Sequence, residues 1–479
     1  MLDKHFGKSS ERIDPAQLEL LVDGLEADAA LEDSSEAEAP PKEKKRYRKK
    51  RSSFPDDLVE RELEFDLPEE QKYCSATGKP LKFVRWEEST KYNFVPGHFE
   101  RLKLKRAVYV SPADIEERAD HPQQLLVTAE MAPEHRVIPG CMASAGLLIY
   151  ILVAKYCDHL PLYRLQSIFK RRHDVVIDRN TMCHWIKRCA EILGVLYEAM
   201  RLELLSGNYL QIDETFIKLL DPDTKGKAKQ SHFWVIKAPE AGVLFHFSPS
   251  RSHEVALKLL NGFRGSLQSD GYGAYQTLQG KMSDITPFYC WAHVRRKFVE
   301  SIEVYPAQAA WYIAEIQKLY RVETRAREEN LSVEVRGERR REESQPVLAG
   351  IKARLDRDLG SEDILPSSPL GKAIRYALSL WPGLIRYAEE GSEVVEIDNN
   401  ITENAIRPTA VGKKNWLFIG HPNAGQTSAI IYTIVENCRM WDIDPMEYLR
   451  DVLPRVMDHP ANRVGELLPR AWAEGRVGR

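Results

Sequence analysis

The chain has 479 residues, 43% of them hydrophobic and 29% charged, with a formal net charge of -3 at pH 7. This length is sufficient for two to four domains and a well-buried core. The net charge neither indicates nor excludes a nucleic-acid partner, because opposite charges are segregated along the chain and the total conceals them.

Two further features bear on the compartment. The longest apolar run, residues 141–154, is interrupted by serine and glycine and is too short to span a bilayer, so it predicts a buried helix and no membrane partner. The seven cysteines are scattered and odd in number, and no signal-peptide pattern precedes them. We therefore expect reduced thiols in a cytoplasm.

The first 59 residues are strongly charged. Apolar residues recur at i, i+3, i+4 and i+7 over residues 18–25, after Asp14 and Pro15, which predicts one short amphipathic helix. Residues 26–39 are acidic, and residues 42–51 hold eight basic residues and one acidic residue, so we expect disorder until a partner binds. The basic run has two interpretations, a solvated linker or an arm that binds phosphates.

Short alternating runs between residues 60 and 127 predict a small antiparallel module. Cys74 is its only cysteine, and Thr77 stands where a C-x2-C pair would have its second sulfur. One cysteine cannot form a structural zinc site, so we expect no zinc here.

Residues 142–200 have a helical pattern. Asp178 can cap a helix that buries Met182, Trp185, Ile186 and Cys189, and the preceding helix is joined to it by a short turn, which is typical of a helix-turn-helix. Between Leu160 and Ala190 there are seven basic and two acidic residues, which favours DNA contact over a plain connector. The expected DNA contacts in this region are Arg171, Arg172, Arg179, Lys187 and Arg188.

The next segment, YLQIDETFI (residues 209–217), carries Asp213 and Glu214 inside an apolar run. Acidic residues are depleted in strands and costly to bury unless they are paired or bound to metal, so this strand is a candidate for chemistry. Two strands (residues 231–238 and 242–248), a helix (253–263) and a fourth strand ending at Asp270 follow. The order strand, strand, strand, helix, strand is that of a ribonuclease H-like core.

A fifth strand, ending near Cys290 or Trp291, runs into a basic helix. Arg295, Arg296 and Lys297 can hold the phosphates of a DNA strand, with Trp291 available to stack on a displaced base. The alternative is that Trp291 is a core residue and the basic residues are solvated.

The second and third acids are separated by 133 positions of mostly helical pattern, which predicts an all-helical insertion at one edge of the core. In DNNITENAIRP, Asp398 or Asn399 can cap a helix on which Asn399, Glu403 and Arg407 share a face, until Pro408 interferes. A routine ion pair between Glu403 and Arg407 is the alternative. The expected DNA contacts in this region are Arg407, Lys413 and Lys414.

The motifs QIDET, SDGYGAY, CWAHVRRKF and DNNITENAIRPTAVGKKNWLFIG occur in an order that resembles the DDE transposases of the insertion sequence 66 family, and the resemblance runs over nearly the whole chain. It implies a ribonuclease H-like core with a mixed five-stranded sheet, and it assigns Asp213, Asp270 and Glu403 as catalytic, metal-binding residues. It does not select Glu214, which lies on the opposite strand face. Three carboxylates suit two magnesium ions, with manganese as a substitute.

Two departures from the family are visible. Only MLDKH precedes FGKSSER, where the family has a longer leucine-rich helix that would support self-association, and Cys74 alone stands in place of a cysteine-rich zinc module. The predicted divisions are residues 1–59 (helix and linker), 60–130 (β module), 131–205 (helical DNA-binding region), 206–303 and 393–442 (core), 304–392 (insertion) and 443–479 (helical tail).

The leading hypothesis is a bacterial, nucleoid-associated transposase that cleaves at the ends of an insertion sequence and joins the 3′ hydroxyls to target DNA. In this hypothesis Asp213 bridges two magnesium ions, while Asp270 and Glu403 each complete one site. The expected partners are double-stranded DNA, further copies of the chain and accessory proteins of the same element. A nuclease on the same core and a DNA-binding protein that has lost catalysis are the alternatives.

Overall fold

The computed structural model describes a subset of the chain, namely residues 97–105, 108–110, 126–128, 130–220, 228–271, 273 and 282–477. The predicted N-terminal helix, both charged segments and Cys74 lie outside these residues. Of the predicted β module, the structure describes residues 97–105 and 130 and one antiparallel pair, β1 (Val108–Val110) with β2 (Leu126–Thr128).

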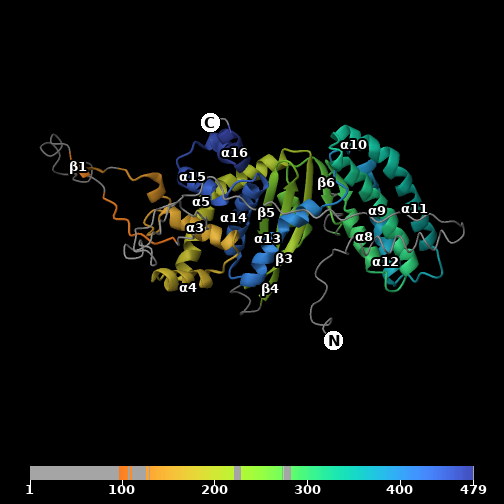
Figure 1. The fold of residues 1–479 in the computed structure, drawn as a ribbon, viewed down its shortest axis with the longest axis horizontal. Coiled ribbons are helices and arrows are strands. Elements are labelled where there is room, and N and C mark those ends of the chain that lie inside the picture. Colours follow the sequence, from red (N-terminus) through yellow and green to blue (C-terminus); the bar gives the residue numbers. More distant parts are fainter. Residues whose placement is uncertain are drawn as a thin grey trace, which may run out of the picture. The chain divides into compact units, whose positions relative to one another are not determined.

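A mixed sheet of six strands forms the centre of the fold (Figure 1). Its strands are β3 (Tyr209–Leu220), β4 (Ala228–Ala238), β5 (Gly242–Ser248), β6 (Gly265–Ser269), β7 (Ile285–Tyr289) and β8 (Phe418–Ile419). Five strands lie in the order β5-β4-β3-β6-β7. Strands β3, β4 and β5 are antiparallel neighbours, whereas β6 runs parallel to β3 and β7 runs parallel to β6.

The prediction of five strands was therefore one strand short. Strand β6 pairs with β3 only over Tyr209 to Gln211, so the rest of this edge of β3 is left for another partner. β8 pairs there in parallel, with Lys218 opposite Phe418 and Leu219 opposite Ile419. A two-residue strand has too little sequence pattern to be recognised in advance.

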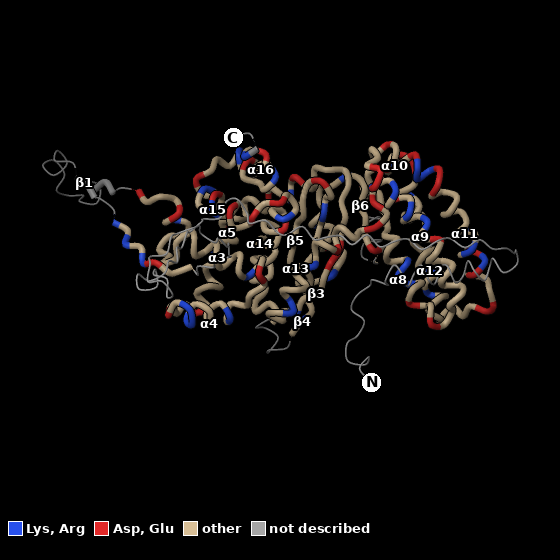
Figure 2. The backbone as a smooth tube through the Cα atoms, viewed as in Figure 1, with Lys and Arg blue, Asp and Glu red and all other residues tan. Residues whose placement is uncertain are grey.

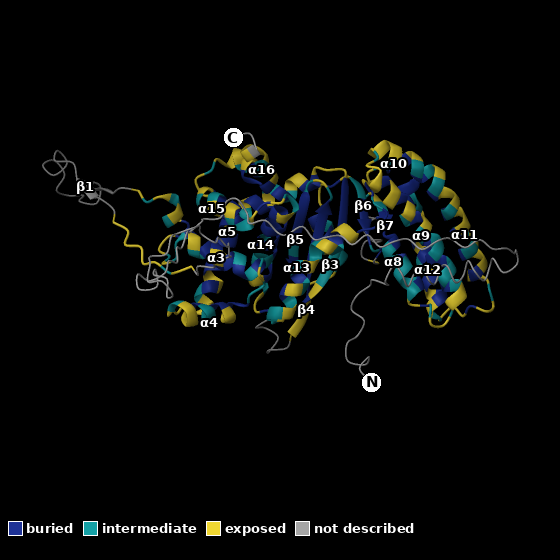
Figure 3. Ribbon diagram, viewed as in Figure 1, coloured by how far each residue is buried: buried dark blue, intermediate teal, exposed yellow. Residues whose placement is uncertain are grey.

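Helices that lie before, between and after the strands in sequence share one hydrophobic core with the sheet. They are α3 (Ala145–Tyr156), α4 (Leu162–His173), α5 (Arg179–Leu205), α6 (His253–Leu259), α14 (Pro422–Met440), α15 (Pro445–Arg455) and α16 (Pro469–Val477). The predicted cap of α5 is confirmed, because the Asp178 carboxylate accepts a hydrogen bond of 2.7 Å from the backbone N–H of Asn180. Figure 3 shows the sheet and the inner faces of these helices as buried.

Helix α14 also covers the edge strand β5. Backbone N–H groups of alternate β5 residues donate to its side chains: Val243 to Asn437 (3.1 Å), Phe245 to Thr433 (2.9 Å) and Phe247 to Gln426 (3.2 Å). Unpaired edge groups would otherwise offer a template for another strand, so α14 closes this side of the sheet.

The predicted helical insertion is α9 (Pro306–Glu328), α10 (Val333–Arg339), a π-helical turn (Arg340–Ser344), α11 (Gln345–Leu359) and α12 (Pro369–Ile385). We call these elements the helical insertion. They form a second core with β7 and α8 (Trp291–Val299), so the insertion adjoins the β7 edge of the sheet (Figure 1).

Helix α13 (Asn400–Trp416) continues through Pro408, although we expected Pro408 to interfere with this helix. A proline inside a helix removes one backbone hydrogen bond. Packing against the sheet offsets the loss of this hydrogen bond, because α13 lies across β3 and β4 and buries Thr402, Thr409 and Gly412 there. The remaining short helices are of the 3-10 type, at Pro133–His135, Arg386–Ala388 and Ala461–Leu467. Within the described ranges, no helix combines the length and apolarity needed to cross a bilayer.

Candidate active site

Asp213 lies in the middle of β3, paired with Val235 of β4. Its carboxylate accepts a 2.8 Å hydrogen bond from the backbone N–H of Glu214. Burial raises the pKa of Asp213 well above its usual value, and the neighbouring carboxylates Glu214, Asp270 and Glu403 raise it further. The other two predicted acids, Asp270 and Glu403, are therefore close enough to oppose the ionisation of Asp213.

Glu214, the next residue on the strand, has a different environment. Successive side chains of a strand point to opposite faces. The Glu214 side chain is 1% exposed and forms an ion pair with Arg251, which follows β5. This pairing gives Glu214 a structural partner of its own.

Asp270 directly follows β6, in a tight turn. The next residue, Gly271, has a positive φ of 78°, and a Cβ atom there would lie 2.6 Å from the Leu380 side chain of α12. Only glycine combines this conformation with this contact. The Asp270 backbone carbonyl accepts a 2.6 Å hydrogen bond from the Tyr376 hydroxyl, also on α12.

Glu403 lies in the first turn of α13. Its carboxylate is 3.6 Å from His293 Nε2 and 3.7 Å from Arg296 Nη2, both on α8. Asn399, at the start of α13, is fully buried, and its amide has no hydrogen-bond partner among the described residues. Arg407 is exposed at the solvent side of α13. Asn399, Glu403 and Arg407 therefore occupy one helix, but their environments range from core to solvent.

These carboxylates fit a divalent cation by donor chemistry. Oxygen ligands of this kind suit magnesium, and a cation would relieve the repulsion that raises the pKa of Asp213. The three do not enclose a site in this conformation: no group of three His, Cys, Asp or Glu side chains within the described ranges is close enough to hold a metal ion. Glu403 instead lies beside His293 and Arg296.

A buried polar network beside the acids was missed by the sequence analysis. Gln211 Nε2 donates to Gln268 Oε1 at 2.9 Å, and the Tyr209 hydroxyl donates to the same oxygen at 2.6 Å. Gln211 Oε1 accepts from the Thr402 hydroxyl of α13 at 2.8 Å. Tyr209 and Gln211 precede Asp213 at a spacing of two, so polar residues on alternate positions of an apolar strand were the available signal.

The basic residues of α4 and α5 fall into two groups. Arg171, Arg172 and Arg179 are exposed, and in the described part of the chain none of them forms an ion pair. Lys187 and Arg188 both pair with Glu191 one turn further along α5. The dense basic patch at the end of α4 is visible in Figure 2.

The proposed stacking role of Trp291 is wrong. Its side chain is fully buried in the core shared with the insertion, and its indole N–H donates to the Leu384 carbonyl at 2.9 Å. A base therefore has no access to the ring. The neighbouring basic residues Arg295, Arg296 and Lys297 remain half-buried on α8, where Lys297 pairs with Glu300 at 2.9 Å.

Near the end of α13, Lys413 and Lys414 differ in exposure. Lys413 donates to the Phe216 carbonyl at 3.1 Å and lies 3.7 Å from the centre of the Phe216 ring. Burial and the adjacent Lys414 lower the pKa of Lys413. Lys414 is exposed, so it is the lysine of this pair with access to a phosphate.

The raised pKa of Asp213 predicts how metal-free stability depends on pH. The folded state holds this proton more tightly than the unfolded state, so the free energy of unfolding should fall as pH rises above about 4 and level off beyond the folded-state pKa. Magnesium should restore stability at neutral pH. Thermal unfolding measured over a range of pH, with chelator or with magnesium, tests this prediction. Asp213→Asn is the control, and it should show both a weaker dependence of stability on pH and a weaker stabilisation by magnesium. Equal magnesium stabilisation of both proteins would contradict it.

Three models of known protein families match this chain. A family model described as "Transposase IS66 family" matches residues 140–427, and one described as "IS66 C-terminal element" matches residues 433–470. A third, described as "Transposase C of IS166 homeodomain", matches residues 1–62, where the sequence analysis predicted only a helix and a linker.

Relatives from Sinorhizobium fredii (strain NBRC 101917 / NGR234) are similar over most of their length. Uncharacterized protein y4jD is 36% identical over 360 residues, which cover 72% of this chain and 69% of the relative. Uncharacterized protein y4qI is 31% identical over 436 residues, which cover 88% of this chain and 77% of the relative.

Proposed function

The chain belongs to the IS66 family of transposases, and from this membership we propose that it cleaves DNA at the ends of an insertion sequence and joins the freed 3′ hydroxyls to target DNA. The observation that carries the proposal is the electrostatic coupling of Asp213 to Asp270 and Glu403, which come from β3, the end of β6 and α13. Two segments far from β3 in sequence thus place carboxylates within electrostatic reach of Asp213.

The strand arrangement supports a ribonuclease H-like core. Three antiparallel strands lead into two parallel ones, and the first strand lies in the middle of the order β5-β4-β3-β6-β7. Asp213 is on the first of these strands and Asp270 follows the fourth. The two acids therefore lie on one strand and just beyond the end of its neighbour in the sheet.

Asp213, Asp270 and Glu403 would hold the magnesium ions. When bound, such ions supply charge stabilisation to the phosphate and activate the attacking oxygen. In cleavage, a water oxygen attacks phosphorus and the 3′ oxygen leaves with the electron pair of the broken P–O bond. In joining, the freed 3′ hydroxyl attacks a target phosphate and a new 3′ hydroxyl leaves. His293 and Arg296 supply donors for the DNA phosphates beside Glu403.

DNA binding has support from other parts of the chain. The homeodomain-like match over residues 1–62 is consistent with a DNA contact N-terminal to the core. Arg171, Arg172 and Arg179 provide exposed charge between α4 and α5, and Arg407 and Lys414 do so on α13. Such contacts position a duplex without reading its sequence.

A strand-transfer assay tests the proposal. A labelled element end and a plasmid target should yield cleaved and joined products with magnesium or manganese, whereas calcium should support binding with little cleavage. Cleavage without joining would favour a nuclease, and binding without either product would favour a DNA-binding protein. Cleavage that persists in excess chelator would refute the metal-dependent mechanism.

A further inference from the structure

The helical insertion contacts the core at both of the later carboxylates. On α12, the Tyr376 hydroxyl donates to the backbone carbonyl of Asp270 at 2.6 Å, and Leu380 packs against Gly271. On α9, the Tyr320 hydroxyl donates to Asp398 Oδ2 at 2.8 Å, five residues before Glu403. Each of the two hydrogen bonds comes from one hydroxyl of the insertion and ends on the backbone of Asp270 or on the segment just before Glu403.

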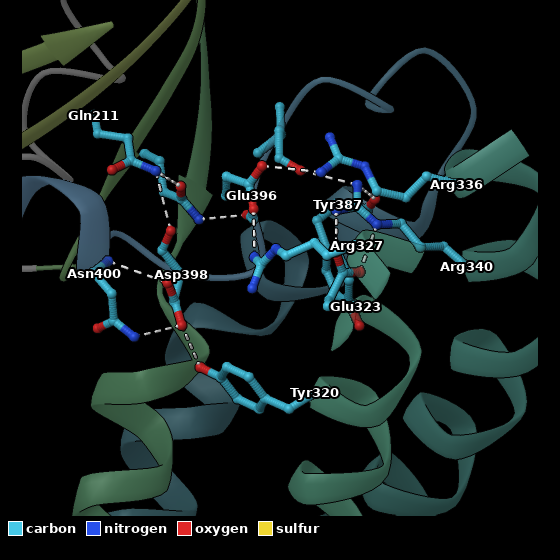
Figure 4. A network of polar contacts seen from close by, with 12 residues as sticks. Gln211, Tyr320, Glu323, Arg327, Arg336, Arg340, Tyr387, Glu396, Asp398 and Asn400 are labelled. Atoms are coloured by element: carbon cyan, nitrogen blue, oxygen red, sulfur yellow. Dashed lines mark hydrogen bonds and ion pairs between the residues drawn. The ribbon is translucent and has the colours of Figure 1, made fainter. Parts of the chain in front are cut away.

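Asp398 links the insertion to the start of α13. Its Oδ1 accepts the backbone N–H of Asn400 at 3.1 Å, and its Oδ2 accepts the Asn400 side chain at 2.8 Å (Figure 4). Its carbonyl accepts from Gln211 Nε2 of β3 at 3.0 Å. Asp398 is thus held by a sheet residue on one side and by Tyr320 on the other, one turn before Glu403.

The residues before Asp398 are held in the same two-sided way. The Glu396 carboxylate pairs with Arg336 at 3.0 Å and with Arg327 at 2.9 Å, both from the insertion. The Glu396 carbonyl accepts from Gln268 Nε2 of β6 at 2.7 Å. Figure 4 shows these contacts along the turns and bends that precede α13 (residues 393–399).

Arg340, in the π-helical turn, is fully buried at the base of this network. Its guanidinium forms two 2.7 Å hydrogen bonds with Glu323 and donates to the Val395 carbonyl at 2.9 Å. A buried polar group that is fully hydrogen-bonded makes the surrounding structure rigid. Any displacement would leave a charge or a carbonyl without a partner in a medium of low dielectric constant.

We propose that the helical insertion positions Asp270 and Glu403 relative to Asp213, with Tyr376 and Tyr320 as positioning residues. Asp213 lies inside β3, where it is paired with Val235 of β4, whereas Asp270 follows the end of a strand and Glu403 lies in the first turn of a helix. Metal-binding groups require placement to about half an ångström, so these two need additional support. The proposal rests on the proposed function for the role of the carboxylates.

Three single-hydroxyl variants of the full chain provide the test. Tyr320→Phe and Tyr376→Phe each remove one contact between the insertion and the site. Tyr312→Phe is the matched control, because this α9 tyrosine donates only within the insertion, to Asp358 at 3.0 Å. Manganese binding is measured by electron paramagnetic resonance, and local opening by hydrogen exchange.

We expect Tyr320→Phe and Tyr376→Phe to raise the manganese concentration at half saturation by about threefold to tenfold, since one hydrogen bond contributes on that scale. Exchange should accelerate at residues 396–404 in Tyr320→Phe and at residues 267–271 in Tyr376→Phe. Tyr312→Phe should match the wild type at both places, and all three variants should bind element ends normally.

Unchanged hydrogen exchange near the site in both Tyr320→Phe and Tyr376→Phe would overturn the proposal. It would also be overturned if these two variants reached half saturation at the same manganese concentration as Tyr312→Phe. Neither readout depends on cleavage. A wild-type protein that fails to cleave would therefore refute the proposed function, while the exchange comparison would still decide whether the insertion holds these segments.

Discussion

Asp213→Asn should leave element-end binding intact and lower the rate of cleavage by about three orders of magnitude. Stabilisation of phosphate charge by bound metal is worth several kcal/mol, and about 1.4 kcal/mol corresponds to a factor of ten. The asparagine keeps the side-chain volume and removes a buried carboxylate whose pKa is already raised, so the fold should be retained. Single-turnover cleavage of a labelled end measures the effect. Asp270→Asn and Glu403→Gln should give losses of the same order.

The control is the adjacent acid. Glu214→Gln changes the same strand by the same chemistry, but its side chain points to the other face and pairs with Arg251. We expect a much smaller loss of cleavage, accompanied by a modest loss of stability from the weakened ion pair. A loss as large as that of Asp213→Asn would show that the wrong face of β3 had been assigned to catalysis. Full activity in all four variants would refute the catalytic hypothesis itself.

Combined replacement of Arg171, Arg172 and Arg179 by glutamine should weaken element-end binding by about two to three orders of magnitude at moderate salt. Each phosphate contact adds close to one unit to the slope of log affinity against log salt, so the slope should fall by about three. We chose these three arginines because each side chain is exposed and forms no ion pair among the residues that the structure describes. Titrations of a labelled end at several salt concentrations measure both quantities.

Lys187→Gln combined with Arg188→Gln is the matched control on α5. Both side chains already pair with Glu191, so their contribution to phosphate binding should be smaller than that of the three arginines. If the slope of log affinity against log salt concentration is unchanged in the triple variant, α4 and α5 connect other parts of the chain and do not bind DNA. The DNA contact would then be sought in the homeodomain-like region at residues 1–62.

Much of the local structure followed from pattern alone. The apolar runs predicted β3, β5 and the end of β7, and Asp178 predicted the start of α5. These predictions succeeded because strand and helix periods and cap preferences act over a few residues. The burial of Trp291 was not open to such reasoning, since the wall that encloses its ring comes from α12, about ninety positions later.

The sequence by itself determined the order of the three acids, the strands and helix that carry them, and the family to which the chain belongs. Tertiary structure alone decided that β8 completes the sheet, that α13 continues through Pro408, and that Tyr320 and Tyr376 reach from the insertion to the site. The difference has one physical cause. Periodicity shows which face of an element is apolar, whereas a hydrogen bond between residues 78 or 106 positions apart forms only where the tertiary structure packs the two cores together.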